Sequence, residues 1–177
     1  MAEKLLLLEQ ANIFLGDANP EDSNHIKLSS VALPTLERVT ASHLGGGAVS
    51  EVNWSMNAFR ALEPSFKLAG FSESSYRLLG IGTAEAQRFT IYGGLRNKET
   101  GKILQAKAIV RGIIGRLAAD AFERASAFGH DHGITEVTRY ELHVDGEEWF
   151  YMDYFSSVVR QFGNDQTQGM RVALGIE

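Results

Sequence analysis

The segment Tyr140-Glu141-Leu142-His143-Val144-Asp145-Gly146-Glu147-Glu148-Trp149-Phe150 decides how this chain folds. Asp-Gly is a dipeptide that readily adopts the positive φ angles of a tight two-residue turn. Before the turn, apolar side chains alternate with polar ones, which indicates a strand with one face in water. After the turn, aromatic and apolar side chains occupy both faces. The segment therefore predicts a β-hairpin whose second strand needs cover on two sides, and in a chain this small one cover could come from another molecule.

Further strands are predicted on the N-terminal side of this hairpin. Alternation of apolar and polar side chains, bounded by turn residues, predicts strands at 11–15, 25–33, 61–71, 87–95 and 102–114. Pro64 falls inside the third of these, so that strand either lies at a sheet edge or begins only at Ser65. Residues 97–101 are expected to turn the last two strands into a second hairpin. Residues 19–24 and 40–52 are expected to form loops, and the second of these is long and rich in glycine.

Two or three short helices complete the prediction. Ser72 as an N-cap and Gly80 as a stop predict a helix over 73–79. Asp165 with Gln168 three residues later resembles a capping box that opens a terminal helix. The alanines of 117–128 also suit a helix, although this segment lies between two strands. We therefore expect a mainly β fold, an antiparallel β-sandwich or barrel with two or three short helices, in one domain over 1–177 with an extended loop at 40–52 and a C-terminal arm at 163–177.

The composition excludes several classes of protein. The chain has 177 residues, no cysteine and a net charge of −5, so disulfides and thiolate metal sites are excluded. An acidic chain is a poor general DNA binder, because such affinity depends on lysines and arginines that neutralise phosphates. The only apolar run near the start, residues 5–8, is too short for a signal-peptide core or a membrane span. We expect a soluble protein made in the cytoplasm, with no cofactor and no membrane partner.

The charge is uneven along the chain. Residues 1–60 carry 4 basic and 7 acidic side chains, residues 61–120 carry 9 and 5, and residues 121–177 carry 4 and 10. The net charges are therefore −3, +4 and −6. The basic middle of one copy could face the acidic end of another, or both could be ordinary solvated surfaces.

Short motifs in a fixed order connect this sequence with a known family. They occur at the opening strand, a Leu-Pro strand, a glycine-rich loop, a strand ending in Gly-Phe, an apolar-Arg-Gly step, the Asp-Gly hairpin and the terminal helix. In sequence they are Asn12–Gly16, Leu33–Arg38, Gly45–Val49, Phe66–Phe71, Val110–Gly112, Tyr140–Glu148 and Met170–Ile176. Together they resemble the major tail tube protein of contractile-tailed phages and of R-type bacteriocins.

The resemblance implies a structural virion protein and not an enzyme. Such proteins form hexameric rings that stack into a hollow tube inside a contractile sheath, and DNA passes through the tube without specific binding. The implied partners are further copies of the chain, the tail sheath protein, and the tail terminator and baseplate proteins. The implied location is the virion tail, assembled in the cytoplasm of the host bacterium. A phage tube and the tube of a bacteriocin or another injector remain equally compatible with the sequence.

Two surfaces are candidates for contacts between copies. The first is the glycine-rich loop with its flank, because glycine lets the backbone approach a neighbouring subunit without side-chain clash; a merely flexible surface loop is the alternative. The second is the terminal helix, which is too short to be stable alone; packing on its own sandwich is the alternative. The predicted contact residues are Gly45, Gly46, Gly47, Val49, Trp54, Met170, Arg171 and Leu174. Carboxylates on the lumen wall would repel DNA phosphates, and Glu63 and Glu141 are candidates, although for either residue alone an outward-facing surface charge is the simpler explanation.

One enzymatic alternative deserves a test. His130, His132 and Glu136 match the His-x-His-x3-Glu spacing that supplies metal ligands in cupin-type barrels. Arg124 and His143 stand where that motif has its two flanking glycines, and the second half of the motif is missing. A metal-dependent cupin-like β-barrel enzyme is therefore the alternative function, and a solvated loop is the simpler explanation of these histidines.

Overall fold

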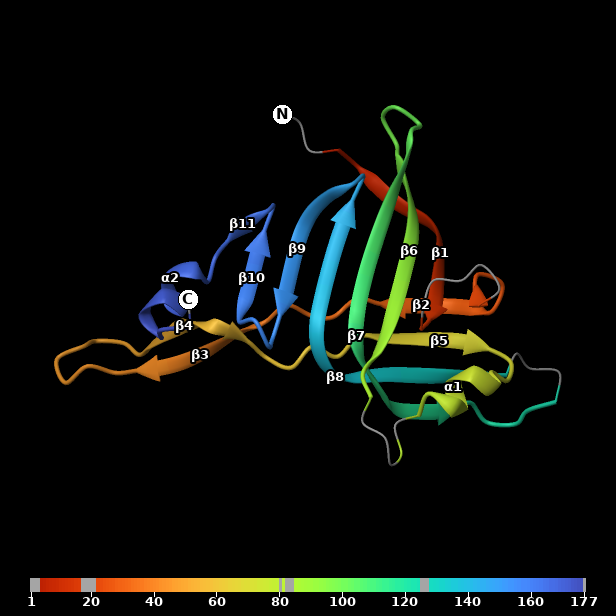
Figure 1. The fold of residues 1–177 in the computed structure, drawn as a ribbon, viewed down its shortest axis with the longest axis horizontal. Coiled ribbons are helices and arrows are strands. Elements are labelled where there is room, and N and C mark those ends of the chain that lie inside the picture. Colours follow the sequence, from red (N-terminus) through yellow and green to blue (C-terminus); the bar gives the residue numbers. More distant parts are fainter. Residues whose placement is uncertain (1–3, 17–21, 80, 82–84, 125–127, 177) are drawn as a thin grey trace.

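The computed structural model describes residues 4–16, 22–79, 81, 85–124 and 128–176. Over these residues the chain is mostly β-strand with two short helices (Figure 1). The strands are β1 (Leu6–Leu15), β2 (Leu28–Ala32), β3 (Arg38–His43), β4 (Val52–Phe59), β5 (Ser65–Ala69), β6 (Gln87–Asn97), β7 (Ile103–Ala119), β8 (Gly129–Val144), β9 (Glu147–Asp153), β10 (Val158–Gln161) and β11 (Asn164–Asp165). The helices are α1 (Glu73–Arg77) and α2 (Gln168–Ala173).

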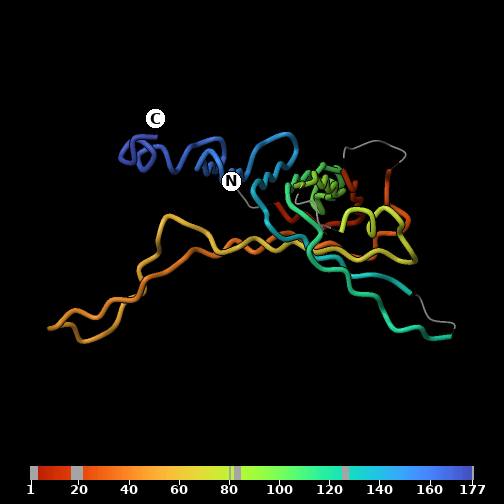
Figure 2. The backbone as a smooth tube through the Cα atoms, turned by 60° about the horizontal axis from the view of Figure 1, so that its bottom comes forward, coloured from red at the N-terminus to blue at the C-terminus, as the bar shows by residue number. Residues whose placement is uncertain are grey.

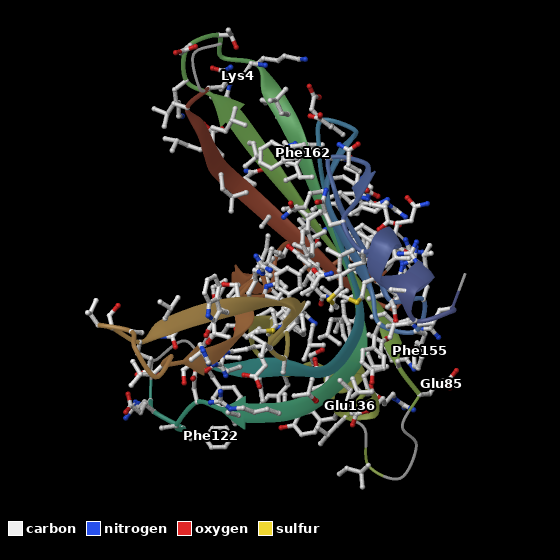
Figure 3. All side chains as sticks on the ribbon, turned by 90° about the vertical axis from the view of Figure 1, so that its left-hand side faces the viewer. Lys4, Glu85, Phe122, Glu136, Phe155 and Phe162 are labelled. Atoms are coloured by element: carbon white, nitrogen blue, oxygen red, sulfur yellow. The ribbon has the colours of Figure 1, made fainter. Side chains whose placement is uncertain are left out.

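Nine of the described strands form one antiparallel sheet with a branch. The main path runs β1-β6-β7-β8-β9-β10-β11, and β5 pairs with both β8 and β2 to form the branch. The first half of β8 pairs with β5, whereas its second half pairs with β9. Since β8 belongs to both parts, the two parts diverge from it as two layers (Figure 3). Strands β3 and β4 form a separate two-stranded sheet.

Glycines allow β7 to bend between the two layers. The pairing of β7 with β8 shifts register between Arg111 and Ile113 and again between Ile114 and Arg116, on either side of Gly112 and Gly115. A Cβ on Gly112 would lie 2.7 Å from the Thr135 carbonyl oxygen, and a Cβ on Gly115 would overlap the Thr135 side chain. Such bulges kink and twist a strand where two parts of a sheet must change direction. The bend therefore depends on the absence of side chains at these two positions.

The core fills the angle between the layers. One side supplies Ile13, Leu15, Phe89, Ile91, Ala108, Val110, Tyr140 and Phe150, and the other supplies Leu62, Phe66, Leu68, Ile114 and Ile134. Phe66 and Phe89 meet across the layers, with their ring centroids 6.4 Å apart. This arrangement confirms the predicted mainly antiparallel β fold, but in a single copy the described sheet is not closed into a barrel.

The Asp-Gly hairpin forms as the sequence predicts. Asp145 and Gly146 have φ angles of 53° and 83° and connect β8 with β9. The strand around Pro64 begins only at Ser65, which is the second of the two options. Pro64 itself is buried just before it.

Other local predictions need correction. No helix spans 117–124, because β7 continues to Ala119 and pairs with β8 there, so sheet pairing overrides the helix preference of alanine. The segment 40–52 is not one long loop, since its ends belong to β3 and β4 and only 44–51 connect them. The terminal helix starts at Gln168, after Thr167, instead of at a capping box opened by Asp165. Gly80 and residues 19–21, expected as a helix stop and as loop, lie outside the described residues.

The bend can be tested by adding a methyl group. Gly112→Ala should lower the free energy of unfolding by about 1–3 kcal/mol, because the new Cβ would clash with backbone and not with a flexible side chain. Gly169→Ala is the matched control, since a Cβ on Gly169 meets no atom within 4 Å. Urea unfolding of both variants measures the difference. Equal stability of the two variants would contradict a steric role for Gly112.

Candidate assembly surfaces

The hairpin formed by β3 and β4 extends away from the body of the molecule (Figure 2). Apart from Val39 and Phe59, every residue of these two strands is exposed. Within the described part of the chain, β3 and β4 pair only with each other. An isolated two-stranded hairpin is at best marginally stable in water. The hairpin therefore lacks the support that would keep it ordered in a single copy.

The hairpin tip carries the apolar side chains and glycines that the sequence singled out. Trp54 is 58% exposed, and Val49 is fully exposed on the connecting loop. Gly46 and Gly47 have no positive φ, and a Cβ on either would meet nothing within 4 Å. Gly45 also has no positive φ, and a Cβ there would make only ordinary contacts. Nothing within one copy requires glycine at these positions, so any requirement must come from a neighbouring molecule.

The C-terminal arm is held by a buried arginine. The Arg171 guanidinium donates hydrogen bonds to the Asp165 carboxylate at 2.7 Å and to the Thr167 hydroxyl at 3.0 Å. Arg171 holds the pKa of the Asp165 carboxyl well below its usual range. The Thr167 hydroxyl also accepts the Val159 N–H, which ties the start of α2 to β10. Arg171, predicted to contact another copy, is thus mostly enclosed within its own chain.

The apolar face of α2 points into solvent. Met170 is 52% and Leu174 is 65% exposed. Packing of these two side chains on their own sandwich, the simpler explanation of the helix, is therefore not what the structure shows. The arm presents two unburied apolar side chains on an anchored helix, as a contact surface requires.

The hairpin and the C-terminal arm project from the same end of the molecule and diverge (Figure 2). Between their bases lies a hollow of about 800 Å³, lined by Leu62, Val137, Met152, Phe155 and other side chains. Phe155, labelled in Figure 3, lines this hollow and is exposed. Glu63, a predicted lumen residue, is exposed and also lines this hollow. This end of the molecule therefore has a concave, largely apolar surface with an arm on each side.

The opposite edge of the main sheet is open over the N-terminal part of β1. Strand β1 ends the path of paired strands and bonds to β6 on one side, and on its other side Ser23 and Asn24 pair with its C-terminal end at Phe14 and Ile13. Leu7 and Leu8 on β1 are exposed. The Glu9 carboxylate fastens the end of this strand, accepting hydrogen bonds from Arg96 at 2.7 Å and Lys98 at 2.9 Å that lower its pKa to about 2. The edge is thus well ordered and still has free backbone groups, which makes it suitable for pairing with another chain.

The second predicted lumen residue, Glu141, lies on the polar face of the main sheet. Its carboxylate accepts one hydrogen bond from Arg139 at 2.6 Å and lies 3.2 Å from the His143 ring. The neighbouring Tyr151 of β9 is covered by the guanidinium groups of Arg139 and Arg160. Tyr151 is therefore covered within the chain, whereas Trp149, two residues earlier on the same face of β9, is 38% exposed. Cover of this face by another molecule stays a prediction. Glu141 is also partly neutralised, which weakens it as a source of negative potential.

The histidines of the metal alternative pack in the interior. His130 lies 2.9 Å from the Tyr76 hydroxyl, and the His132 ring stacks on Phe66 at 4.3 Å. Glu136, labelled in Figure 3, has a φ of 51° on β8 and is exposed, whereas both histidines are buried. Among the residues that the structure describes, no three His, Cys, Asp or Glu side chains are arranged to hold a metal ion. The three residues of the cupin-like pattern are therefore not brought together.

Comparison with known protein families shows which family this chain belongs to. A sequence model of the family described as phage tail tube protein FII matches residues 8–175. This chain belongs to the phage tail tube protein FII family. It is a structural tail tube protein, as the motifs predicted. No curated protein sequence matches it significantly.

Solved structures share the fold of this tail tube protein. One is the sheath/tube terminator of the PVC extracellular contractile injection system in its extended state, with a TM-score of 0.57 and 12% identity over 81% of this chain and 99% of that one. The sheath-tube complex of the same system has a TM-score of 0.56 and 13% identity over 80% of this chain and 93% of that one. The tube-terminating cap of the anti-feeding prophage has a TM-score of 0.58 and 12% identity over 81% of this chain and 93% of that one. At these identities the similarity shows a common fold alone.

Sequence reasoning missed two features of the tail tube protein. The Asp165–Arg171 pair was hidden because Asp165 also matched a capping pattern, and the two residues are six apart. The concave surface between the arms was hidden because residues 57–63, 135–137 and 152–159 meet only in the folded chain. Neither described helix is long and apolar enough to cross a lipid bilayer.

The arm anchor can be tested by removing its cation. Arg171→Gln should release α2, because the Asp165 carboxylate and the Thr167 hydroxyl would lose their charged donor. Hydrogen exchange at the amides of 168–174 should become faster, while exchange in β6–β8 stays unchanged. Arg77→Gln, which removes an exposed ion pair with Glu73, is the control. Unchanged protection of α2 would contradict the anchoring role.

The buried His132 predicts a loss of stability in acid. Burial lowers the pKa of the His132 ring, so the folded chain favours the neutral form and the unfolded chain binds the proton more readily. Stability should be complete above the ordinary histidine pKa of about 6.5 and should fall below it. His132→Phe should flatten this decline between about pH 7.5 and about pH 5. Urea unfolding at a series of pH values measures this decline in the free energy of unfolding, and His43→Gln, at an exposed histidine, is the control. An unchanged decline in His132→Phe would show that His132 does not cause it.

Proposed function

We propose that this tail tube protein forms hexameric rings that stack into the hollow tube of a contractile tail. The observation that carries the proposal is the β3–β4 hairpin, which a single copy leaves unsupported in water with the apolar side chains of Val52, Trp54 and Met56 exposed. The open edge of β1 and the concave surface at the opposite end support it, because they are different surfaces on opposite sides of one molecule. A contact between different surfaces closes into a ring when the rotation between copies allows it.

The hairpin is proposed to contact a neighbouring copy, with the 44–51 tip contributing to stacking along the tube axis. Burial of each large apolar side chain contributes about 1.5–3 kcal/mol. Trp54, Met56 and Val49 together then provide a substantial part of the contact energy. Glycines at 45–47 would let the backbone of the tip lie flat against the neighbour. The α2 arm, with Met170 and Leu174, is proposed as a second contact between copies.

The lumen is proposed to conduct DNA without binding it. Carboxylates on its wall would repel phosphates during passage. Glu63 suits this role better than Glu141, because Glu63 is exposed and makes no ion pair with any described residue, whereas Glu141 faces Arg139. The proposed partners are the tail sheath, terminator and baseplate proteins. The proposed location is the virion tail, assembled in the host cytoplasm. No described geometry favours the metal-dependent enzyme as a second candidate.

Negative-stain electron microscopy of the purified protein tests the proposal. The wild-type protein should form rings or hollow rods with sixfold symmetry. Trp54→Glu should reduce assembly at least about tenfold, because it places a charge where an apolar contact is expected. The matched control is Ile81→Glu, which changes an exposed apolar side chain that belongs to neither arm. Single small particles in the wild type, or equal assembly by both variants, would overturn the proposal.

A further inference from the structure

Three arginines form a row across the polar face of the main sheet. Strand register pairs Arg88 of β6 with Arg111 of β7, and Arg111 with Arg139 of β8. Adjacent strands lie about 4.8 Å apart, so the three side chains start next to one another. Val110 and Tyr140, the sequence neighbours of Arg111 and Arg139, are buried in the core. Since side chains alternate along a strand, the arginines lie on the opposite, solvent-facing side of the sheet.

The charge of this row is largely uncompensated. Arg88 and Arg111 are exposed, and neither makes an ion pair with any residue that the structure describes. Arg139 shares the Glu141 carboxylate with His143. Like charges directly opposite each other in a sheet are destabilising. Two such arginine pairs side by side therefore repel each other when no anion is bound. An anion over the row would offset this repulsion.

The row borders a hollow that can receive such an anion. The hollow is about 480 Å³ in volume, and Ala86, Gln87, Ile109, the three arginines and Glu141 line it. The Glu141 carboxylate is already paired with Arg139, so Arg88 and Arg111 keep their positive charge free. Ile109 is buried on this polar face, between Lys107 and Arg111. The flat fork of arginine suits carboxylate groups, which it binds with two parallel hydrogen bonds. We propose that Arg88, Arg111 and Arg139 form a docking site for a carboxylate-rich segment of a protein other than this chain.

A protein segment fits the site better than a nucleic acid. Glu141, Glu148 and Asp153 lie on neighbouring strands of the same face, and Asp153 is the register partner of Arg139. A long phosphate backbone running across the face would pass all of these carboxylates and be repelled by them. A short acidic segment confined to the arginine row would pass fewer of them. The row itself spans only two strand spacings, about 10 Å, which is enough for a few carboxylates. The site therefore matches a short acidic segment and not a long polyanion.

A second copy of this chain is a poorer match. Exposed carboxylates that make no described ion pair, such as Glu51, Glu85 and Glu123, lie on three different loops of the described chain. Separate single charges cannot fill a row of three arginines at once. The proposal goes beyond the tube function, since the site lies within one copy and does not depend on ring formation.

Binding of labelled polyanions tests the site. The full-length protein is titrated at low ionic strength into a fluorescein-labelled oligoglutamate peptide and, separately, into a labelled oligothymidylate of equal charge, and anisotropy is measured. The triple variant Arg88→Gln/Arg111→Gln/Arg139→Gln should bind the peptide about tenfold or more weakly than the wild type. It should stay folded, because it removes like-charge pairs, and thermal unfolding checks this. The control is Arg77→Gln/Arg116→Gln/Arg124→Gln, which loses the same charge from exposed arginines elsewhere.

The outcomes separate the alternatives. Peptide binding that is lost in the first variant and kept in the control supports the site. Equal loss in both variants, or no loss, overturns it, and tighter binding of the oligothymidylate through the row assigns the site to phosphates instead. If the first variant fails to form the rings or rods seen with the wild type and the control forms them, the row binds a second copy and the proposal is wrong. Peptide binding by a protein that never assembles would leave this site standing and defeat only the tube proposal.

Discussion

The β3–β4 hairpin imposes the constraint on which the rest of this structure depends. Its two strands pair only with each other among the described residues, and almost all their side chains face water. A pair of strands gains too little from its own hydrogen bonds and side-chain contacts to balance the entropy lost on ordering. The exposed apolar side chains of the hairpin add a further cost of hydration in a single copy, and they would gain free energy if an assembly buried them. In the proposed tube, self-association would supply the missing contacts, which is consistent with membership of a tail tube family.

The bend of β7 and β8 explains how one small chain can leave such an element exposed and still fold. By bending at Gly112 and Gly115, β7 contributes to both layers and encloses a core to which the hairpin adds only Phe59, at its base. The β3–β4 hairpin and the C-terminal arm are then free to extend from the same end. The Asp165–Arg171 pair fixes the arm, and the Glu9 contacts fix the open edge of β1 at the other side. The residues that stabilise a single copy are thus different from those left exposed for contacts between copies.

Much of the fold could be predicted from local sequence, and the missed parts depend on distant contacts. The Asp145-Gly146 turn and its flanking strands follow from dipeptide chemistry and alternation, which act over a few residues. The segment after Leu117 could not be assigned, because its alanines favour a helix and only pairing with His130 and His132 makes it a strand. The glycines at 45–47 suggested a long loop, yet their flanks are strands. The exposure of Trp54 and Leu174 could not be read from the sequence either, since an apolar residue looks the same whether its partner lies in the same chain or in another.

Hydrogen exchange of the β3–β4 amides, compared between dispersed and assembled protein, tests the central claim most directly. Local protection reports whether a segment is held in place by its surroundings. The account predicts rapid exchange over 38–59 in dispersed copies and slow exchange once copies associate, with β6–β8 slow in both. Strong protection of 38–59 in dispersed copies would show that the hairpin is already supported within one chain. Rapid exchange in both states would show that other surfaces hold the assembly together, and either result would contradict the account.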